Sequence, residues 1–119
     1  MSAPQQVEDC AFCLIVAGAI PADVVLETPT ALAFRDLAPQ APTHVLVIPR
    51  THTANAAELA EVEPQTAAEL FRVAAAVAET EGLSGDYRVV LNTGAGAGQS
   101  VFHTHLHLLG GRPMSWPPG

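Results

Sequence analysis

The chain has 119 residues, 49% of them apolar, which predicts one folded domain over residues 1–119, with a loose polar N-terminus over 1–9. Five arginines and no lysine stand against twelve acidic residues, a formal charge of −7. This balance argues against a general nucleic-acid binder, because neutralising a phosphate backbone needs a basic face, although it permits a mononucleotide held by backbone N–H groups. The absence of lysine excludes Schiff-base chemistry and a Walker-type lysine.

The first half of the chain predicts a short helix and three strands. The helix covers residues 10–19, with Asp9 as a candidate N-cap and apolar residues at i, i+3 and i+4. The longest apolar run, residues 11–20, is too short to span a bilayer and has no basic region before it, so we expect no membrane segment, no signal peptide and a cytosolic location. Three largely apolar runs separated by proline-containing segments predict strands over 24–27, 31–35 and 43–48, the last of them rich in β-branched residues.

The second half continues the alternation of helix and strand signals. The segment Thr53-Ala54-Asn55 can cap a short helix that ends at or before Glu63. A long helix covers 64–81, because proline suits a first helical turn and Gly82 suits a helix end. A strand, a glycine-rich loop, a second strand and a non-helical tail come next, over 87–91, 92–100, 103–109 and 110–119. This order predicts an α+β domain with a mainly antiparallel, five-stranded sheet, one long helix and one or two short ones.

Three of the five histidines, His103, His105 and His107, occupy alternate positions of the last predicted strand. A strand sends alternate side chains to opposite faces, so the three imidazoles share one face at spacings of about 6.5–7 Å. Imidazole is an intermediate core former that titrates near neutral pH, which favours a reactive site over a packing role. The row can be a metal site or a nucleophile with proton partners, and a solvated histidine-rich face is the remaining alternative.

The glycine-rich loop before this strand can bind an anion beside the histidines. It contains Gly-x-Gly-x-Gly over 94–98 and leads into a strand, so it is not a dinucleotide fingerprint. Successive backbone N–H groups in such a loop form an anion-binding nest, and the Ser100 hydroxyl would add a donor. A flexible hairpin turn is the alternative. With phosphate in the loop, the central histidine, His105, is the natural nucleophile for a phospho-histidine intermediate, flanked by His103 and His107.

Residues 103–109 resemble the His-φ-His-φ-His-φ-φ signature of the histidine triad (HIT) family, with Thr104 as one weak φ position. Further segments resemble the Hint branch of that family, at 33–36, 39–44, Asn92, 98–101, 110–112 and the terminal Trp-Pro-Pro-Gly over 116–119. The resemblance covers nearly the whole chain. It implies an α+β homodimer whose sheet continues across the interface, and the hydrolysis of purine nucleoside phosphoramidates, AMP or GMP joined to an amine.

The resemblance also implies a role for each site residue. His105 would attack the α-phosphate to form a nucleotidyl-histidine that water hydrolyses, His107 would contact the phosphate, and Ser100 and His44 would lie near the departing amine. Asp36 would bind the ribose hydroxyls. The remaining implied substrate-binding residues, which could instead be ordinary core, are Phe12, Ile15, Ile20, Phe34, Leu37, Asn92, Gly98, Gln99, Val101 and Trp116, the last reaching from the tail toward the partner subunit's site.

Cys10 and Cys13 form a Cys-x-x-Cys pair with three interpretations: a redox pair, an inert buried pair or a zinc site. Thioredoxin-type pairs follow a strand, and no strand is predicted before Cys10. The pair resembles that of zinc-binding bacterial HIT proteins, which implies His52 and His103 as further ligands of a structural zinc that the chemistry does not require. His103 belongs to the triad as well; as a ligand it would anchor the strand that presents His105.

Three other functions remain open from the sequence. The first is a non-catalytic adaptor dimer that binds a purine nucleotide. The second is a dinucleoside polyphosphate hydrolase of the same family, against which the terminal Trp-Pro-Pro-Gly speaks. The third is a hydrolase with a catalytic zinc on the three strand histidines.

Overall fold

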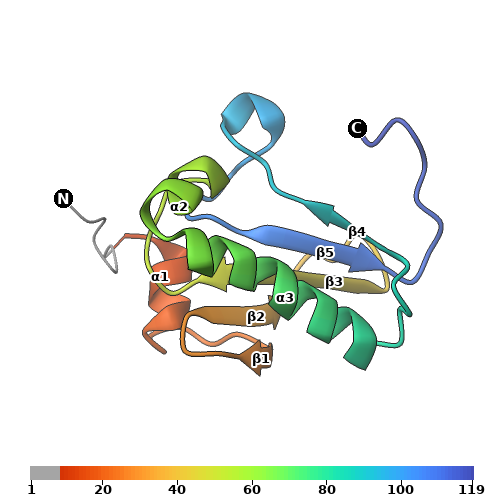
Figure 1. Ribbon diagram of the computed structural model, residues 1–119, viewed down its shortest axis with the longest axis horizontal. Helices are drawn as coiled ribbons and strands as arrows, with labels where there is room; N and C mark the ends of the chain where they lie inside the picture. The colour runs from red at the N-terminus through yellow and green to blue at the C-terminus, as the bar shows by residue number, and fades with distance from the viewer. Residues whose placement is uncertain (1–8) are drawn as a thin grey trace.

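The structure is a computed structural model that describes residues 9–119, so most of the predicted loose N-terminus lies outside the described residues. Five strands form one antiparallel sheet in the order β1-β2-β3-β5-β4 (Figure 1). The strands are β1 (Val24–Glu27), β2 (Ala31–Arg35), β3 (Thr43–Pro49), β4 (Tyr87–Val90) and β5 (Leu106–Gly110). The helices are α1 (Ala11–Val16), α2 (Ala56–Val62), α3 (Pro64–Thr80) and a short 3₁₀ turn, η1 (Ala95–Ala97). The predicted α+β fold class is confirmed.

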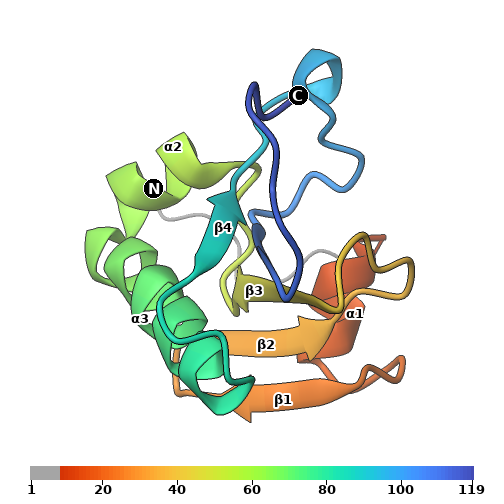
Figure 2. The same ribbon diagram turned by 90° about the vertical axis from the view of Figure 1, so that its right-hand side faces the viewer.

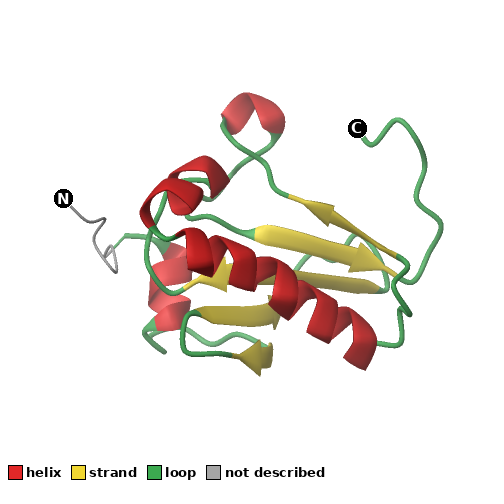
Figure 3. Ribbon diagram, in the orientation of Figure 1, coloured by secondary structure: helices red, strands yellow, loops and turns green. Residues whose placement is uncertain are grey.

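The long helix α3 lies across one face of the sheet, as the secondary-structure colouring makes plain (Figure 3). Leu70, Val73 and Val77 of α3 pack in one buried cluster with residues of the sheet such as Val45 and Leu106. The alanine-rich composition of the helix permits this close approach. Proline at the first position of α3 and Gly82, with φ +76° just after its end, begin and end the helix as predicted.

The opposite face of the sheet carries α1, so the two helices enclose the central strands (Figure 2). Phe12 and Cys13 of α1 pack against Phe34, Leu46 and Ile48, while the alternate residues of the same strands face α3. All seven residues of β3 are buried, because this strand is covered on both faces. The period-two alternation of a strand thus separates a mainly apolar face, packed against α3, from the face that carries His44 and His107.

The last strand begins later than predicted, at Leu106 instead of 103. The backbone N–H of Thr104 donates to the carbonyl of Thr53 at 2.8 Å, and the two threonine hydroxyls lie 2.6 Å apart. The backbone of this stretch is therefore bonded to the loop after β3 and has left the ladder of the sheet. His103 and His105 precede the strand, and only His107 lies within it.

The first helix is also shorter than predicted, and its N-cap is Cys10, not Asp9. The Sγ atom of Cys10 accepts the backbone N–H of Cys13 at 3.3 Å. Asn55 caps α2 as predicted, since its side chain accepts the N–H of Glu58 at 3.0 Å. Within residues 9–119, no helix combines the length and the apolar character that crossing a membrane requires.

We expect Leu70→Ala to lower the free energy of unfolding by about 2–5 kcal/mol, because it opens a cavity between α3 and the sheet. The matched control is Arg72→Ala, two residues along the same helix on its exposed side, with an expected change within about 0.5 kcal/mol. Urea denaturation followed by circular dichroism measures both. Equal destabilisation of the two variants would contradict this assignment of the core.

Candidate active site and metal-binding cluster

A cavity of about 310 Å³ opens on the α1 face of the sheet. Of the residues predicted to bind substrate or to act in catalysis, the structure brings these to its lining: Phe12, Ile15, Ile20, Phe34, Asp36, Leu37, Ser100, Val101, His105 and His107. Leu37 is fully exposed, so it stands at the rim instead of forming a buried wall. The end of β2 with the residues that follow it, and the loop before β5, are far apart in sequence and together line this one cavity.

His105 is held by a bond from its own segment. Its Nδ1 lies 2.8 Å from the carbonyl oxygen of His103, and because a carbonyl only accepts, Nδ1 carries the proton. In the neutral ring Nε2 is then a bare lone pair. The ring of Phe12 meets that of His105 edge-on, with centroids 5.1 Å apart. His105 is 8% exposed, so the geometry presents one unprotonated nitrogen in a fixed orientation.

His107 and His44 form a hydrogen-bonded pair behind the cavity. Nδ1 of His44 accepts the backbone N–H of Gln40 at 3.0 Å, so the proton of the neutral ring is on Nε2. That Nε2–H donates to Nδ1 of His107 at 2.9 Å. His107 must then carry its own proton on Nε2. The carboxylate of Asp36 lies 3.5 Å from Nε2 of His44.

Burial keeps this histidine pair neutral. It lowers the pKa of His107 to about 4, with further lowering by the nearby His105 and His44 and an opposing effect of Asp36. Burial also lowers the pKa of His44, which Asp36 again opposes. At pH 7 both rings are therefore neutral. The position of the proton on each ring decides which nitrogen donates a hydrogen bond and which accepts one.

Some predicted residues lie outside the lining of the cavity. Gln99 is buried and ties the glycine loop together: its Oε1 accepts the N–H of Gly94 at 2.8 Å, and its Nε2 donates to the carbonyls of Ala54 and Val101 at 2.6 and 3.0 Å. Trp116 is 82% exposed in the tail. The others outside the lining are His44, Asn92, Gly98 and His103.

The structure adds lining residues that the sequence interpretation missed. They are Ala11, Pro21, Ala22, Asp23, Arg35 and Leu46. Leu46 had a readable signal, because it lies two positions after His44 on a predicted strand and so shares its face. No sequence pattern pointed to Asp23 or Arg35, since only the pairing of β1 with β2 brings them together. Their side chains form an ion pair at 3.8 Å.

The two cysteines meet two histidines beside the cavity. The ligand atoms of Cys10, Cys13, His52 and His103 all lie within 4.8 Å of one another. Nδ1 of His103 is 3.4 and 3.5 Å from the two sulfurs, and Nδ1 of His52 is 3.3 Å from the Sγ of Cys13. Tetrahedral zinc with bonds of about 2.3 Å to sulfur and 2.0–2.1 Å to nitrogen separates its ligand atoms by about 3.3–3.8 Å. The donor set and its spacing fit zinc.

His103 is oriented for this cluster and not for the cavity. Its Nε2–H donates to the carbonyl of Pro49 at 2.9 Å, which leaves the Nδ1 lone pair facing the sulfurs. Burial lowers the pKa of His103 to about 4, so the ring is neutral, as a metal ligand must be. Within residues 9–119, His103, His105 and His107 do not bring their ring nitrogens into one cluster, which argues against a catalytic zinc on all three.

A family model described as HIT domain matches residues 17–114. The chain belongs to the HIT domain family. A crystal structure of a HIT family hydrolase from Legionella pneumophila is 50% identical, covers 93% of this chain and 100% of that chain, and has a TM-score of 0.89. This HIT protein is also similar to a 14 kDa zinc-binding protein of Zea mays, 48% identical over 91% of this chain and 86% of the relative. A histidine triad nucleotide-binding protein of Candida albicans is 30% identical, with 92% and 83% coverage and a TM-score of 0.80.

We expect the stability of this HIT protein to fall between pH 7 and pH 4.5 in part because of His107. Its folded pKa is near 4 and the ordinary value is 6.5, so the unfolded chain binds the proton first and acid favours unfolding. At pH 4.5 the free energy of unfolding should have fallen by about 2–3 kcal/mol more in the wild type than in a His107→Asn variant. Urea denaturation across this pH range measures the free energy of unfolding of both proteins. Titrating groups that the two proteins share contribute equally to both curves, so the difference between the curves reports on His107. Parallel stability curves for the two proteins would contradict the prediction.

Proposed function

We propose that this HIT protein hydrolyses purine nucleoside phosphoramidates, AMP or GMP joined to an amine, through a covalent nucleotidyl-histidine at His105. The observation that carries the proposal is the bond from Nδ1 of His105 to the carbonyl of His103, which leaves Nε2 as a lone pair at an apolar cavity. A nucleophilic imidazole needs one unprotonated ring nitrogen directed at the substrate, and this tautomer supplies it. The similarity to the Legionella hydrolase and to the Candida nucleotide-binding protein supports the reaction class and the ligand class.

The cavity suits a purine nucleotide. Phe12, Ile15 and Phe34 supply apolar walls for a flat base, and Ile20 and Leu37 lie toward the solvent. Asp36 lines the same hollow, and its carboxylate can accept the two ribose hydroxyls. A carboxylate accepts several hydrogen bonds, so its existing bond from the N–H of Ala38, at 2.8 Å, does not prevent this.

The reaction then runs in two displacements. Nε2 of His105 attacks the α-phosphorus, the P–N bond breaks, and the amine leaves with the bonding electron pair and a proton from solvent beside Ser100. The Nε2–H of His107 donates to a phosphate oxygen and stabilises its charge. Water next attacks phosphorus, loses a proton to solvent and releases His105 and the nucleoside monophosphate. His44 acts from behind by holding the tautomer of His107.

We propose that Cys10, Cys13, His52 and His103 hold a structural zinc. The ligand spacing supports this, as does the similarity to the maize zinc-binding protein. Four protein ligands close the site, so the metal would stabilise the fold and would offer no open position for substrate.

We also propose that the protein is a homodimer. β4 is the last strand of the sheet order, and all four of its residues are half-buried, so its outer edge is available for a second copy. Pairing of the two β4 edges would continue the sheet across the interface. The exposed Trp116 lies in the C-terminal tail, from which it would reach the partner's cavity.

We expect His105→Ala to lower the turnover of a fluorogenic adenosine phosphoramidate by at least about 10³-fold, because it removes the nucleophile. Arg72→Ala, on the exposed side of α3, is the control with unchanged turnover. Mass spectrometry of acid-quenched wild type should also find one nucleotidyl group per chain. Equal rates for wild type and His105→Ala would refute the proposal, and AMP binding without any turnover would favour a non-catalytic nucleotide-binding protein.

We expect one zinc ion per chain by elemental analysis, and its loss in Cys13→Ser. Chelation should lower the melting temperature of the wild type and leave that of Cys13→Ser unchanged, because only the wild type has metal to lose. His44→Asn, a histidine substitution outside the cluster, should keep the zinc. Full zinc content in Cys13→Ser would contradict the assigned ligand set.

A further inference from the structure

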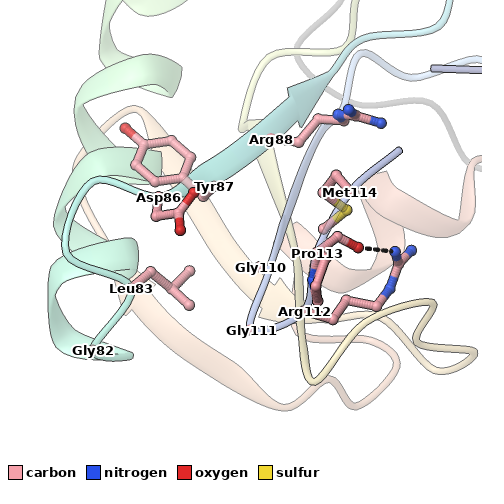
Figure 4. Close-up of a pocket in the computed structure, with 10 residues that line it drawn as sticks. All are labelled: Gly82, Leu83, Asp86, Tyr87, Arg88, Gly110, Gly111, Arg112, Pro113 and Met114. Atoms are coloured by element: carbon pink, nitrogen blue, oxygen red, sulfur yellow. Dashed lines mark hydrogen bonds between the residues drawn. The ribbon is translucent and has the colours of Figure 1, made fainter. Parts of the chain in front are cut away.

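The last residue of β5 and the two residues after it, Gly110-Gly111-Arg112, have no part in the reaction described above, yet they lie against the loop over 38–42. Nε of Arg112 donates to the carbonyl of Gln40 at 3.0 Å, and its Nη1 donates to the carbonyl of Pro113 at 2.9 Å, drawn as a dashed line in Figure 4. Gly111 has φ +91°, and a Cβ there would lie 3.0 Å from Cβ of Pro42. The end of β5 and the loop over 38–42 are therefore in close contact.

The backbone of the loop over 38–42 determines which ring nitrogen of His44 carries the proton. The peptide groups on the two sides of Gln40 face in different directions: its carbonyl accepts from Arg112, and its N–H donates to Nδ1 of His44 at 3.0 Å. Local bonds from the N–H of Ala38 to Asp36 and from the amide of Gln40 to Ala38 shape the loop. Arg112 adds a restraint from a distant part of the chain, since 72 positions separate it from Gln40.

We propose that Arg112 is a positioning residue: by holding Gln40 it keeps the proton of His44 on Nε2, and through it the proton of His107 on Nε2. This inference rests on the proposed function. His107 lines the cavity, and its Nδ1 is taken by His44, so Nε2 is the nitrogen left for the substrate phosphate.

The alternative tautomers show what this restraint prevents. Without the N–H of Gln40, the proton of His44 can move to Nδ1, and the bare Nε2 would then accept a hydrogen bond from a protonated Nδ1 of His107. His107 would turn a lone pair toward the cavity, where it repels phosphate oxygens instead of donating to them. The loop thus selects between a donor and an acceptor at the phosphate, with no change in net charge.

The test measures the tautomers and the turnover of Arg112→Ala in the full-length protein. In ¹⁵N-labelled wild type, histidine ¹⁵N spectra should find Nδ1 unprotonated and Nε2 protonated in both His44 and His107. Arg112→Ala should give a mixture of tautomers. Its kcat for the adenosine phosphoramidate should fall about tenfold, with KM changed less than about threefold, because the lost donor acts mainly on the charged transition state. Arg112→Lys should restore part of both signals, since an ammonium can also donate to the Gln40 carbonyl.

Arg88→Ala is the matched control. Nη2 of Arg88 donates to the carbonyl of Ser115 at 2.9 Å, so this bond restrains the same tail and does not involve Gln40. We expect wild-type tautomers in this variant. Wild-type tautomers in Arg112→Ala, or the same mixture in both variants, would overturn the inference. If the wild type shows no phosphoramidate turnover, the proposed function fails, and the ¹⁵N spectra still decide the role of Arg112.

Discussion

The site depends on the contacts that the buried imidazole of His103 makes with both of its ring nitrogens. This ring is fully buried, and burying an imidazole is tolerated only when both ring nitrogens have partners. One nitrogen binds the carbonyl of Pro49 at the end of β3, and the other faces Cys10 and Cys13 at the start of α1. Three segments that are distant in sequence are joined at one side chain. The carbonyl of the same residue then orients His105.

The sheet divides the tasks of the protein between its faces. One face buries the apolar side of α3 and supplies most of the core, with Leu70 and Leu108 among its members. The other face carries α1, the cysteine–histidine cluster and the cavity. A closely packed core holds the strands in register, and the register of β3 with β5 puts His44 and His107 within hydrogen-bond distance. The packing of α3 against the other face of the sheet thus helps to fix the positions of His44 and His107.

Neutral histidines make the proposed chemistry a matter of tautomers. The N–H of Gln40 and the carbonyl of His103 are backbone groups that cannot exchange the roles of donor and acceptor, so each assigns one ring nitrogen without ambiguity. His107 takes its tautomer from His44. A low-dielectric site strengthens such bonds, and it also makes an incorrectly placed lone pair more costly.

The sequence by itself determined the fold class, most element boundaries and the row of candidate histidines, because hydrophobic periodicity, helix caps and the spacing of His103, His105 and His107 are local properties of the chain. The zinc ligands were predicted through a family resemblance. Only the tertiary structure decided the rest. The late start of β5 follows from the bond of Thr104 to Thr53. The tautomers follow from bonds to backbone N–H and C=O groups, which almost every residue has, so no sequence pattern reveals them. These contacts join residues far apart in the chain, so their geometry exists only after the sheet has formed.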